Sequence, residues 1–166
     1  MAIIRIAKLT DMHRVNEIYN QAVLQKFQTA DSTIISLEDR IKWFQKHHDD
    51  RYLVLVLEED HVVKGWATLS KYRNGRAALR NTAEVSYYVH EDHQGQGVGT
   101  QLLNAAIEKA KEIGFKNLFA MLLEANTPSI GILEKFGFRE WGRIPLAAEI
   151  DNQEYDHLYY GLRLNS

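Results

Sequence analysis

Cysteine is absent from the 166-residue chain, and proline occurs only twice. Without cysteine the protein has no disulfide framework, no thiolate zinc site and no cysteine nucleophile. No apolar run approaches the roughly 20 residues that a membrane-spanning helix requires. Residues 1–6 show no basic segment ahead of an apolar one, so we expect no secretory signal. These absences favour a cytoplasmic protein that makes no membrane contact.

Neither sign of charge dominates, because 20 Lys and Arg face 22 Asp and Glu, for a net charge of −2. A protein that binds the phosphate backbone of nucleic acids usually carries a basic excess, so we expect no nucleic-acid partner. The hydrophobic content of 45% and the charged content of 25% are typical of globular proteins. Single domains cluster near roughly 100–200 residues. We therefore expect one globular domain over residues 1–166.

The apolar periodicity predicts a mixed α/β domain. Its order is one strand, two helices, three strands, a helix, a strand, a helix and two final strands joined by a polar loop. The predicted strands are 3–9, 52–57, 62–69, 82–89, 118–123, 138–143 and 155–164, and the helices contain 15–22, 41–44, 102–113 and 130–136.

A glycine-rich segment, 93–99, connects the strand 82–89 to a helix. Glycine lets backbone N–H groups turn toward an anion, and a helix N-terminus adds partial positive charge, so the segment predicts a pyrophosphate site. A P-loop requires Gly-Lys-Ser/Thr, whereas residues 97–100 read Gly-Val-Gly-Thr. A dinucleotide-binding fold requires G-x-G-x-x-G near the first strand, whereas here G-x-G-x-G lies deep in the chain. A tight connection that binds nothing is the remaining alternative.

Residues 94–99 match the acetyl-CoA-binding pattern of the GNAT acetyltransferases, Gln/Arg-x-x-Gly-x-Gly/Ala, at every fixed position. Asn126-Thr127-Pro128-Ser129 with residues 134–138 resembles the second cofactor-side motif of that family. Residues 82–89, 18–23 and 36–44 resemble the central strand and first two helices of its phosphinothricin and methionine-sulfone N-acetyltransferase group. The resemblance implies an α/β (α+β) GNAT fold, in which helices flank a mixed, mostly antiparallel twisted sheet that is splayed between its fourth and fifth strands.

The same resemblance implies an N-acetyltransferase that moves acetyl from its cosubstrate acetyl-CoA to the primary amine of a small amino acid or amino-acid analogue. Since the chain has no cysteine, no acetyl-cysteine can form, and direct attack in a ternary complex is expected. The family implies no metal. Two alternatives stay open, a protein or peptide N-terminal acetyltransferase and a non-catalytic acyl-CoA-binding module. Similar enzymes often form homodimers, which is an expectation from the resemblance alone.

Residues expected to hold acetyl-CoA lie in the central strand, the glycine-rich segment and the second motif. The resemblance implies that backbone groups of the strand hold the pantetheine arm and that Asn126 bonds the cofactor near its thioester. Tyr87 and Val89 could serve as core residues instead. The predicted set is Tyr87, Tyr88, Val89, Gln94, Gly95, Gln96, Gly97, Val98, Gly99, Thr100, Asn126 and Ser129.

Glu84 is the predicted general base, because an amine attacks only when neutral and Glu84 matches the position of the group's catalytic Glu. An apolar strand would raise its pKa toward a useful value. A solvated position or an ion pair with Arg80 are the alternatives. Many family members place a Tyr, and the group a His, where this chain has Leu133. Tyr87 or Tyr88 could protonate the departing thiolate instead, and we predict Tyr87.

Arg80 matches a position just before the catalytic strand that suits an acidic substrate group, since a guanidinium binds a carboxylate in two-pronged fashion. Arg73 could add to the same field, although a positively charged loop is more often merely solvated. The related group has an aromatic residue followed by Asp/Glu-Thr-Glu where this chain has residues 30–33, Ala-Asp-Ser-Thr. We therefore expect Asp31 at the acceptor, and a substrate other than phosphinothricin itself.

Overall fold

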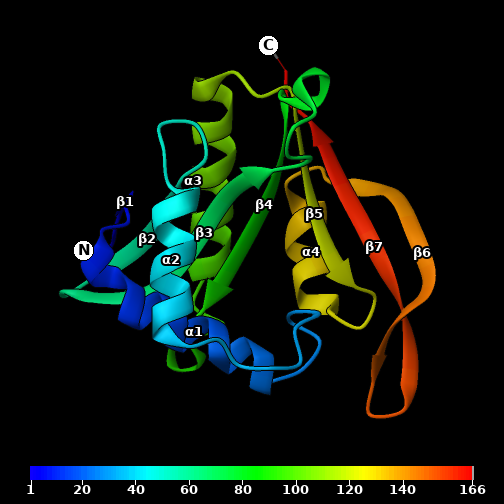
Figure 1. The fold of residues 1–166 in the computed structure, drawn as a ribbon, viewed down its shortest axis with the longest axis horizontal. Coiled ribbons are helices and arrows are strands. Elements are labelled where there is room, and N and C mark those ends of the chain that lie inside the picture. The colour runs from blue at the N-terminus through cyan, green and yellow to red at the C-terminus, as the bar shows by residue number, and fades with distance from the viewer. Residues whose placement is uncertain (166) are drawn as a thin grey trace.

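A computed structural model describes residues 1–165 and contains four α-helices and seven strands in the predicted order (Figure 1). Their bounds are β1 (Ile3–Ile6), α1 (Met12–Leu24), α2 (Leu37–His47), β2 (Val54–Glu59), β3 (Val62–Lys71), β4 (Thr82–Val89), α3 (Val98–Ile113), β5 (Asn117–Leu123), α4 (Thr127–Lys135), β6 (Arg139–Ile150) and β7 (Gln153–Arg163). One sheet holds the strands in the order β1-β2-β3-β4-β5-β7-β6. Among the described strands, only β4 and β5 pair in parallel. The predicted mixed, mostly antiparallel sheet is therefore confirmed.

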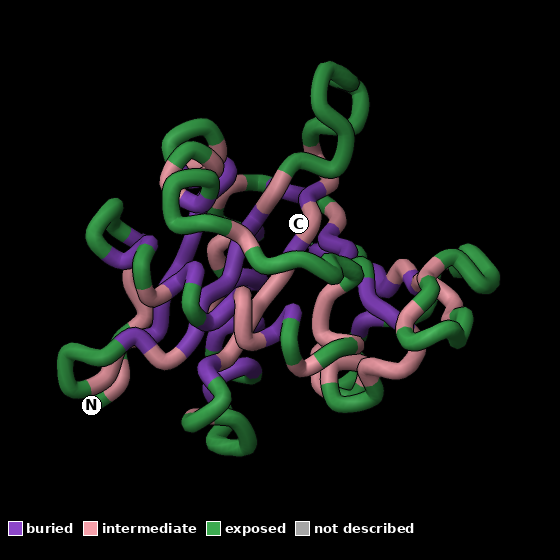
Figure 2. Tube along the Cα trace, turned by 60° about the horizontal axis from the view of Figure 1, so that its bottom comes forward, coloured by how far each residue is buried: buried purple, intermediate pink, exposed green. Residues whose placement is uncertain are grey.

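Helices cover the two faces of the sheet, and the alternation of side chains along β4 sorts residues between those faces. Ala83 and Val85 pack with α3, α4 and the even-numbered residues of β5, whereas Tyr88 packs with α1 and α2 through Trp66 of β3. Buried residues accordingly concentrate in the strands and the inner helix sides (Figure 2). None of the four described helices is long and apolar enough to cross a membrane.

The parallel pair β4 and β5 separates after three residues. Thr82, Ala83 and Glu84 lie opposite 117–119, and no pairing follows, while β5 stays paired with β7 to its end. The amides of residues 116 and 117 both donate to the carbonyl of Asn81, which fixes the start of the two strands together. Figure 1 shows β4 and β5 diverging toward their C-terminal ends. This confirms the predicted splay between the fourth and fifth strands, and Glu84 lies at its apex.

The last hairpin differs from the prediction. A polar loop between strands 138–143 and 155–164 was expected, but β6 continues to Ile150 and β7 begins at Gln153. Only Asp151 and Asn152 connect them, both with left-handed φ values of 54° and 64°. Two such residues form the turn that matches the twist of antiparallel strands. The loop prediction was wrong because β6 is exposed along most of its length and lacks the apolar alternation that marks a half-buried strand.

Candidate active site

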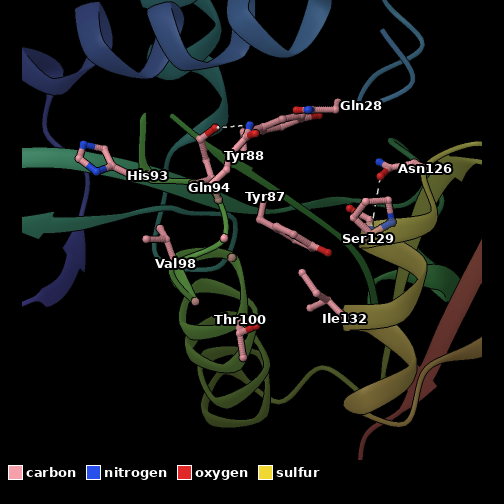
Figure 3. A pocket seen from close by; sticks show the side chains of 15 residues that line it. Gln28, Tyr87, Tyr88, His93, Gln94, Val98, Thr100, Asn126, Ser129 and Ile132 are labelled. Carbon is pink, nitrogen blue, oxygen red and sulfur yellow. Dashed lines mark hydrogen bonds between the residues drawn. The ribbon is translucent and has the colours of Figure 1, made fainter. Parts of the chain in front are cut away.

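A cavity of about 430 Å³, here the first cavity, is lined by the end of β4, the glycine-rich segment and the starts of α3 and α4 (Figure 3). All residues predicted to hold acetyl-CoA line it except Gln96. The side-chain amide of Gln96 instead donates to the carbonyl of Asp92 at 3.3 Å. The remaining lining residues are Gln28, His93, Pro128 and Ile132. His93 lies in the glycine-rich segment and Pro128 in the second cofactor-side motif, whereas no motif indicated Gln28 or Ile132.

The glycine-rich segment leaves backbone donors exposed at the start of α3. Gly95 and Gly97 have φ values of 72° and 81°, a left-handed conformation that side chains disfavour. Gly97 is the N-cap of α3, and no side chain accepts a hydrogen bond from the first turn of this helix. Because the first N–H groups of a helix have no internal partner, they can bind an anion. The turn therefore fits the pyrophosphate of acetyl-CoA.

Tyr87 contributes a buried hydroxyl to the first cavity. Its ring lies between α3 and α4 (Figure 3), and a Cβ atom added to Gly99 would come within 3.4 Å of it. Tyr87 Oη has no hydrogen-bond partner among the described residues, although Ser129 is nearby. A buried polar atom without a partner costs about 1–3 kcal/mol. A polar ligand in the cavity would satisfy this hydroxyl. Burial raises the pKa of Tyr87, and its contact with the Ser129 side chain opposes that shift.

Helix α4 supplies few polar groups to the first cavity. Asn126 Oδ1 accepts a hydrogen bond from the amide of Ser129 at 3.4 Å and so caps α4, which leaves the side-chain NH₂ of Asn126 available to a ligand. Leu133 is only 1% exposed and packs in the hydrophobic core. The position at which related enzymes carry a proton donor is therefore apolar here, and the hydroxyl of Tyr87 comes from the other wall.

A second cavity of about 580 Å³ lies at the start of β4 and β5. The odd-numbered residues of β5 line it, so it opens on the sheet face that does not contact α3. Its wall is aromatic, with Tyr72 edge-on to Phe119 at 4.9 Å and Phe119 stacked on Tyr159 at 6.3 Å. Arg73 is the one charged residue among the described residues that line it. The complete lining is Tyr72, Arg73, Thr82, Asn117, Phe119, Met121, Trp141, Gly142 and Tyr159.

Glu84 lies on β4 between the two cavities. On the same face of the strand, Thr82 lines the second cavity and Tyr88 lines the first. The Glu84 carboxylate makes no hydrogen bond or ion pair with any described residue, and the alternative pairing with Arg80 is not seen. Burial raises the pKa of Glu84 to about 7. A carboxyl group with that pKa is partly ionised at neutral pH and can accept a proton from an amine.

The predicted substrate residues are not all brought together. Arg80 is exposed and lines a shallow hollow, here the basic hollow, together with Arg51, Lys71, Arg73 and Arg76. Arg73 belongs to both the basic hollow and the second cavity, so the two adjoin.

Asp31 is exposed and lies at neither the basic hollow nor the two cavities. It accepts a hydrogen bond from the hydroxyl of Tyr19, whose ring packs edge-on against Tyr88 at 5.1 Å. Asp31 therefore reaches the site only through this pair of tyrosines. Within residues 1–165, no group of three or more acidic or histidine side chains is arranged to hold a metal ion.

Known proteins are similar to this chain in both sequence and architecture. The model of the acetyltransferase (GNAT) family matches residues 12–138. The chain is 37% identical over 162 residues to YwnH of Bacillus subtilis (strain 168), covering 98% of this chain and 99% of that protein. It is 35% identical over 142 residues to the L-amino acid N-acyltransferase MnaT of Escherichia coli (strain K12), covering 86% and 82%.

One similar solved structure contains acetyl-CoA. The GNAT superfamily phosphinothricin acetyltransferase from Sinorhizobium meliloti, in complex with acetyl-CoA, superposes with a TM-score of 0.92 at 26% identity, covering 98% of this chain and 88% of that one. The first cavity offers backbone donors, a side-chain amide and a buried hydroxyl suited to the same molecule. From this family match, the shared fold and a cavity that fits the cosubstrate, we conclude that the chain belongs to the GNAT family of acetyl-CoA-dependent N-acetyltransferases.

Proposed function

We propose that this enzyme acetylates the α-amine of a small amino acid, or amino-acid analogue, that carries an anionic group. The observation that supports this most directly is the position of Glu84 between the first and second cavities. The first cavity fits acetyl-CoA, and the second offers one guanidinium, from Arg73, within aromatic walls. The names of MnaT and of the Sinorhizobium meliloti enzyme favour a free amino acid over a peptide and over a non-catalytic module.

Each wall of the first cavity has a role in holding the cosubstrate. The N–H groups at the start of α3 bind its pyrophosphate, the Asn126 amide bonds near the thioester, and the backbone of 87–89 pairs with the pantetheine arm, since β4 has no partner strand there. When bound, acetyl-CoA supplies the acetyl group as a thioester. The chain has no cysteine that could carry the acetyl group, so transfer to the amine is direct.

Two side chains of β4 handle the protons. Glu84 Oε takes a proton from the acceptor ammonium, which frees the nitrogen lone pair for attack. Tyr87 Oη, on the opposite face of the strand, donates a proton on the cofactor side after the amide has formed. A thiol has a pKa near about 8.5, so thiolate is a tolerable leaving group and the second proton transfer is the less demanding one.

Arg73 binds the acceptor carboxylate in the second cavity. Arg80 and the other cations of the basic hollow attract anionic acceptors toward that cavity, because like-charged walls concentrate an oppositely charged substrate. Asp31 acts at the other end of the acceptor face, where it holds Tyr19 against Tyr88. These roles divide the predicted substrate residues into one direct contact and two that act at a distance.

We further propose that residues 1–166 form a single domain, that two copies associate as a homodimer, and that the enzyme acts in the cytoplasm, where acetyl-CoA is available. One sheet that contains all seven described strands supports the single domain. Exposed apolar side chains on β5 and β6 support the homodimer. They are Met121, Trp141, Ile144 and Leu146. Sedimentation of the purified protein would report its mass, and a monomer at all concentrations would contradict the homodimer.

The experiment for the main proposal follows thiol release from acetyl-CoA with a panel of amines. The panel contains L-methionine sulfone, phosphinothricin, unmodified amino acids, their decarboxylated amines, and short peptides with free N-termini. We expect release with the amino acids and at least about tenfold less with the decarboxylated amines, because Arg73 loses a charge-assisted bond. Acetylation of peptides but not of free amino acids would contradict the proposal. Tight acetyl-CoA binding without thiol release from any amine would support a binding module instead.

A further inference from the structure

Ser70 of β3 is the direct cross-strand neighbour of Glu84. The two residues pair in the antiparallel β3–β4 register, so both side chains project from the sheet face that α1 and α2 cover. The Cβ atoms of such a pair are about 4.5–5.5 Å apart. Ser70 Oγ is therefore the hydroxyl that the sheet register places beside the Glu84 carboxyl. That carboxyl makes no hydrogen bond to any described residue, Ser70 included, so the transfer requires the two side chains to turn toward each other.

The Ser70 hydroxyl continues to a histidine at the end of α2. Ser70 Oγ lies 3.0 Å from His47 Nε2 and 3.3 Å from Thr68 Oγ1. The imidazole of His47 stacks on Trp43, with ring centres 4.9 Å apart and an interplanar angle of 18°, so its orientation is fixed by packing. His47 is only half-buried, so its ring also reaches solvent.

We propose that Ser70 and His47 form the route by which the proton taken up by Glu84 leaves the active site. The proposal rests on the proposed function, because only an acetyltransferase with Glu84 as its base has a proton to discharge there. With an acceptor in the second cavity and acetyl-CoA in the first, ligands cover both ends of the strand segment that carries Glu84. The side toward Ser70 then remains as the path from Glu84 to water.

The proton transfer balances with no additional reactant. Protonated Glu84 gives its proton to Ser70 Oγ while the Ser70 hydroxyl proton passes to His47 Nε2. His47 Nδ1 then releases its own proton to solvent, and proton exchange with solvent returns the neutral ring to the tautomer whose Nε2 accepts. Glu84 is left ionised for the next acceptor. Only bonds between hydrogen and oxygen or nitrogen are formed and broken. The serine hydroxyl is suited to this step because it donates and accepts at the same atom.

The surroundings of His47 favour a neutral ring between turnovers. Burial lowers the pKa of His47. A hydrogen bond to the Leu69 backbone and the charge of Asp49 oppose this shift, while the neighbouring charges of His48 and Lys71 add to it. A neutral imidazole presents one nitrogen as acceptor, as the contact with the Ser70 hydroxyl requires. His47 thus accepts the proton transiently and does not hold it.

The test compares His47→Ala, Ser70→Ala and the matched control His48→Ala. His48 is the next residue along the chain and stacks on Phe44 at 4.6 Å, but it contacts the Val54 amide and not Ser70. At saturating substrates, we expect kcat to fall several-fold in both His47→Ala and Ser70→Ala with KM unchanged, and to stay near wild type in His48→Ala. Added imidazole should restore His47→Ala, because the truncation leaves room beside the hydroxyl, but it should not restore Ser70→Ala.

Imidazole rescue separates proton transfer from a structural role, since lost packing is not restored by a soluble base. Thermal unfolding of each variant checks that it is folded, and the variant Glu84→Gln,His47→Ala should be no slower than Glu84→Gln alone. A His47→Ala enzyme with wild-type kcat, or one slowed without rescue, overturns the exit route while leaving the proposed function intact. A wild-type enzyme that releases no thiol with any amine overturns the proposed function, and the exit route with it.

Discussion

The two cavities of this enzyme are built in different ways. The first cavity draws most of its lining from one stretch, 87–100, with a second contribution from 126–132, and its proposed anion site consists of backbone N–H groups. The second cavity collects side chains from four strands, β4, β5, β6 and β7, and from the loop after β3. A site made of backbone groups depends on local conformation, whereas a site made of side chains depends on how distant segments pack. This difference predicts that changes in the first cavity affect the cosubstrate alone, and that changes in the second affect acceptor choice.

Glu84 belongs to neither cavity and serves both, so its loss has the largest expected effect. Glu84→Gln should lower kcat by roughly 100-fold or more, the range of a general base, while acetyl-CoA still binds with unchanged affinity. In the wild type, kcat/KM should fall as the pH drops below about 7, because the pKa of Glu84 is raised to about 7 and protonated Glu84 accepts no proton. The variant should lack this limb of the pH profile. Thiol release and calorimetric titration measure both.

The pH dependence of thermal stability tests the ionisation of Glu84 independently. The pKa of Glu84 is raised on folding, so the folded state binds the proton more tightly than the unfolded chain does. The ionised carboxylate therefore destabilises the folded state above about pH 7, and this effect disappears below the unfolded value near 4.5. Glu84→Gln should raise the Tm at pH 8 and leave it close to wild type at pH 4. A lower Tm at pH 8 would argue against a buried, unpaired carboxyl.

Arg73 tests the second cavity. Arg73→Gln should raise the acceptor KM by about 10- to 100-fold, because a charge-assisted hydrogen bond contributes about 1.5–3 kcal/mol, and it should leave the acetyl-CoA KM unchanged. Arg80→Gln is the matched control, since Arg80 lines only the basic hollow. We expect its effect to be small and to disappear at high salt, where long-range steering is screened. Equal effects of the two substitutions would remove the distinction between contact and steering.

Gly97 tests the first cavity. Gly97→Ala places a Cβ on a residue with φ of 81°, which costs about 1–2 kcal/mol, so we expect roughly tenfold weaker acetyl-CoA binding and an unchanged acceptor KM. Gly114→Ala controls for strain, because Gly114 has φ of 100° at the other end of α3. The control should lose comparable thermal stability without losing cosubstrate affinity. Acetyl-CoA titration together with Tm measurements separates the two.

Replacing Tyr87 has the smallest expected effect on rate. It should lower the rate while raising the stability. Tyr87→Phe should lower kcat a few-fold, since the thiolate needs little help to leave, and should raise stability by about 1 kcal/mol because a buried hydroxyl without a partner is removed. Tyr88→Phe is the control on the other face of β4 and should keep kcat. The reverse result would transfer the acid role to Tyr88.

Local sequence patterns predicted the features of the fold that depend on residues close together in the chain. The order of helices and strands, the turn at Gly95 and Gly97, and Glu84 in an apolar strand were all evident from spacing and residue type. The polar loop predicted before residue 155 was wrong, because an exposed edge strand such as β6 has no apolar period. Gln28 of the first cavity could not be predicted either, since no motif links the loop after α1 to the start of α4.

The sequence by itself determined the order of helices and strands and the glycine-rich turn at the start of α3, because glycine conformations, helix starts and apolar periodicity act over a few residues. Only the tertiary structure separated Arg73 from Arg80 and gave the Tyr87 hydroxyl its place opposite the apolar Leu133. It also put Ser70 beside Glu84 and His47 beside Ser70. Those relations depend on strand register, on the splay of β4 from β5, and on which side chains are buried away from water. They are properties of packed segments that no stretch of sequence contains alone.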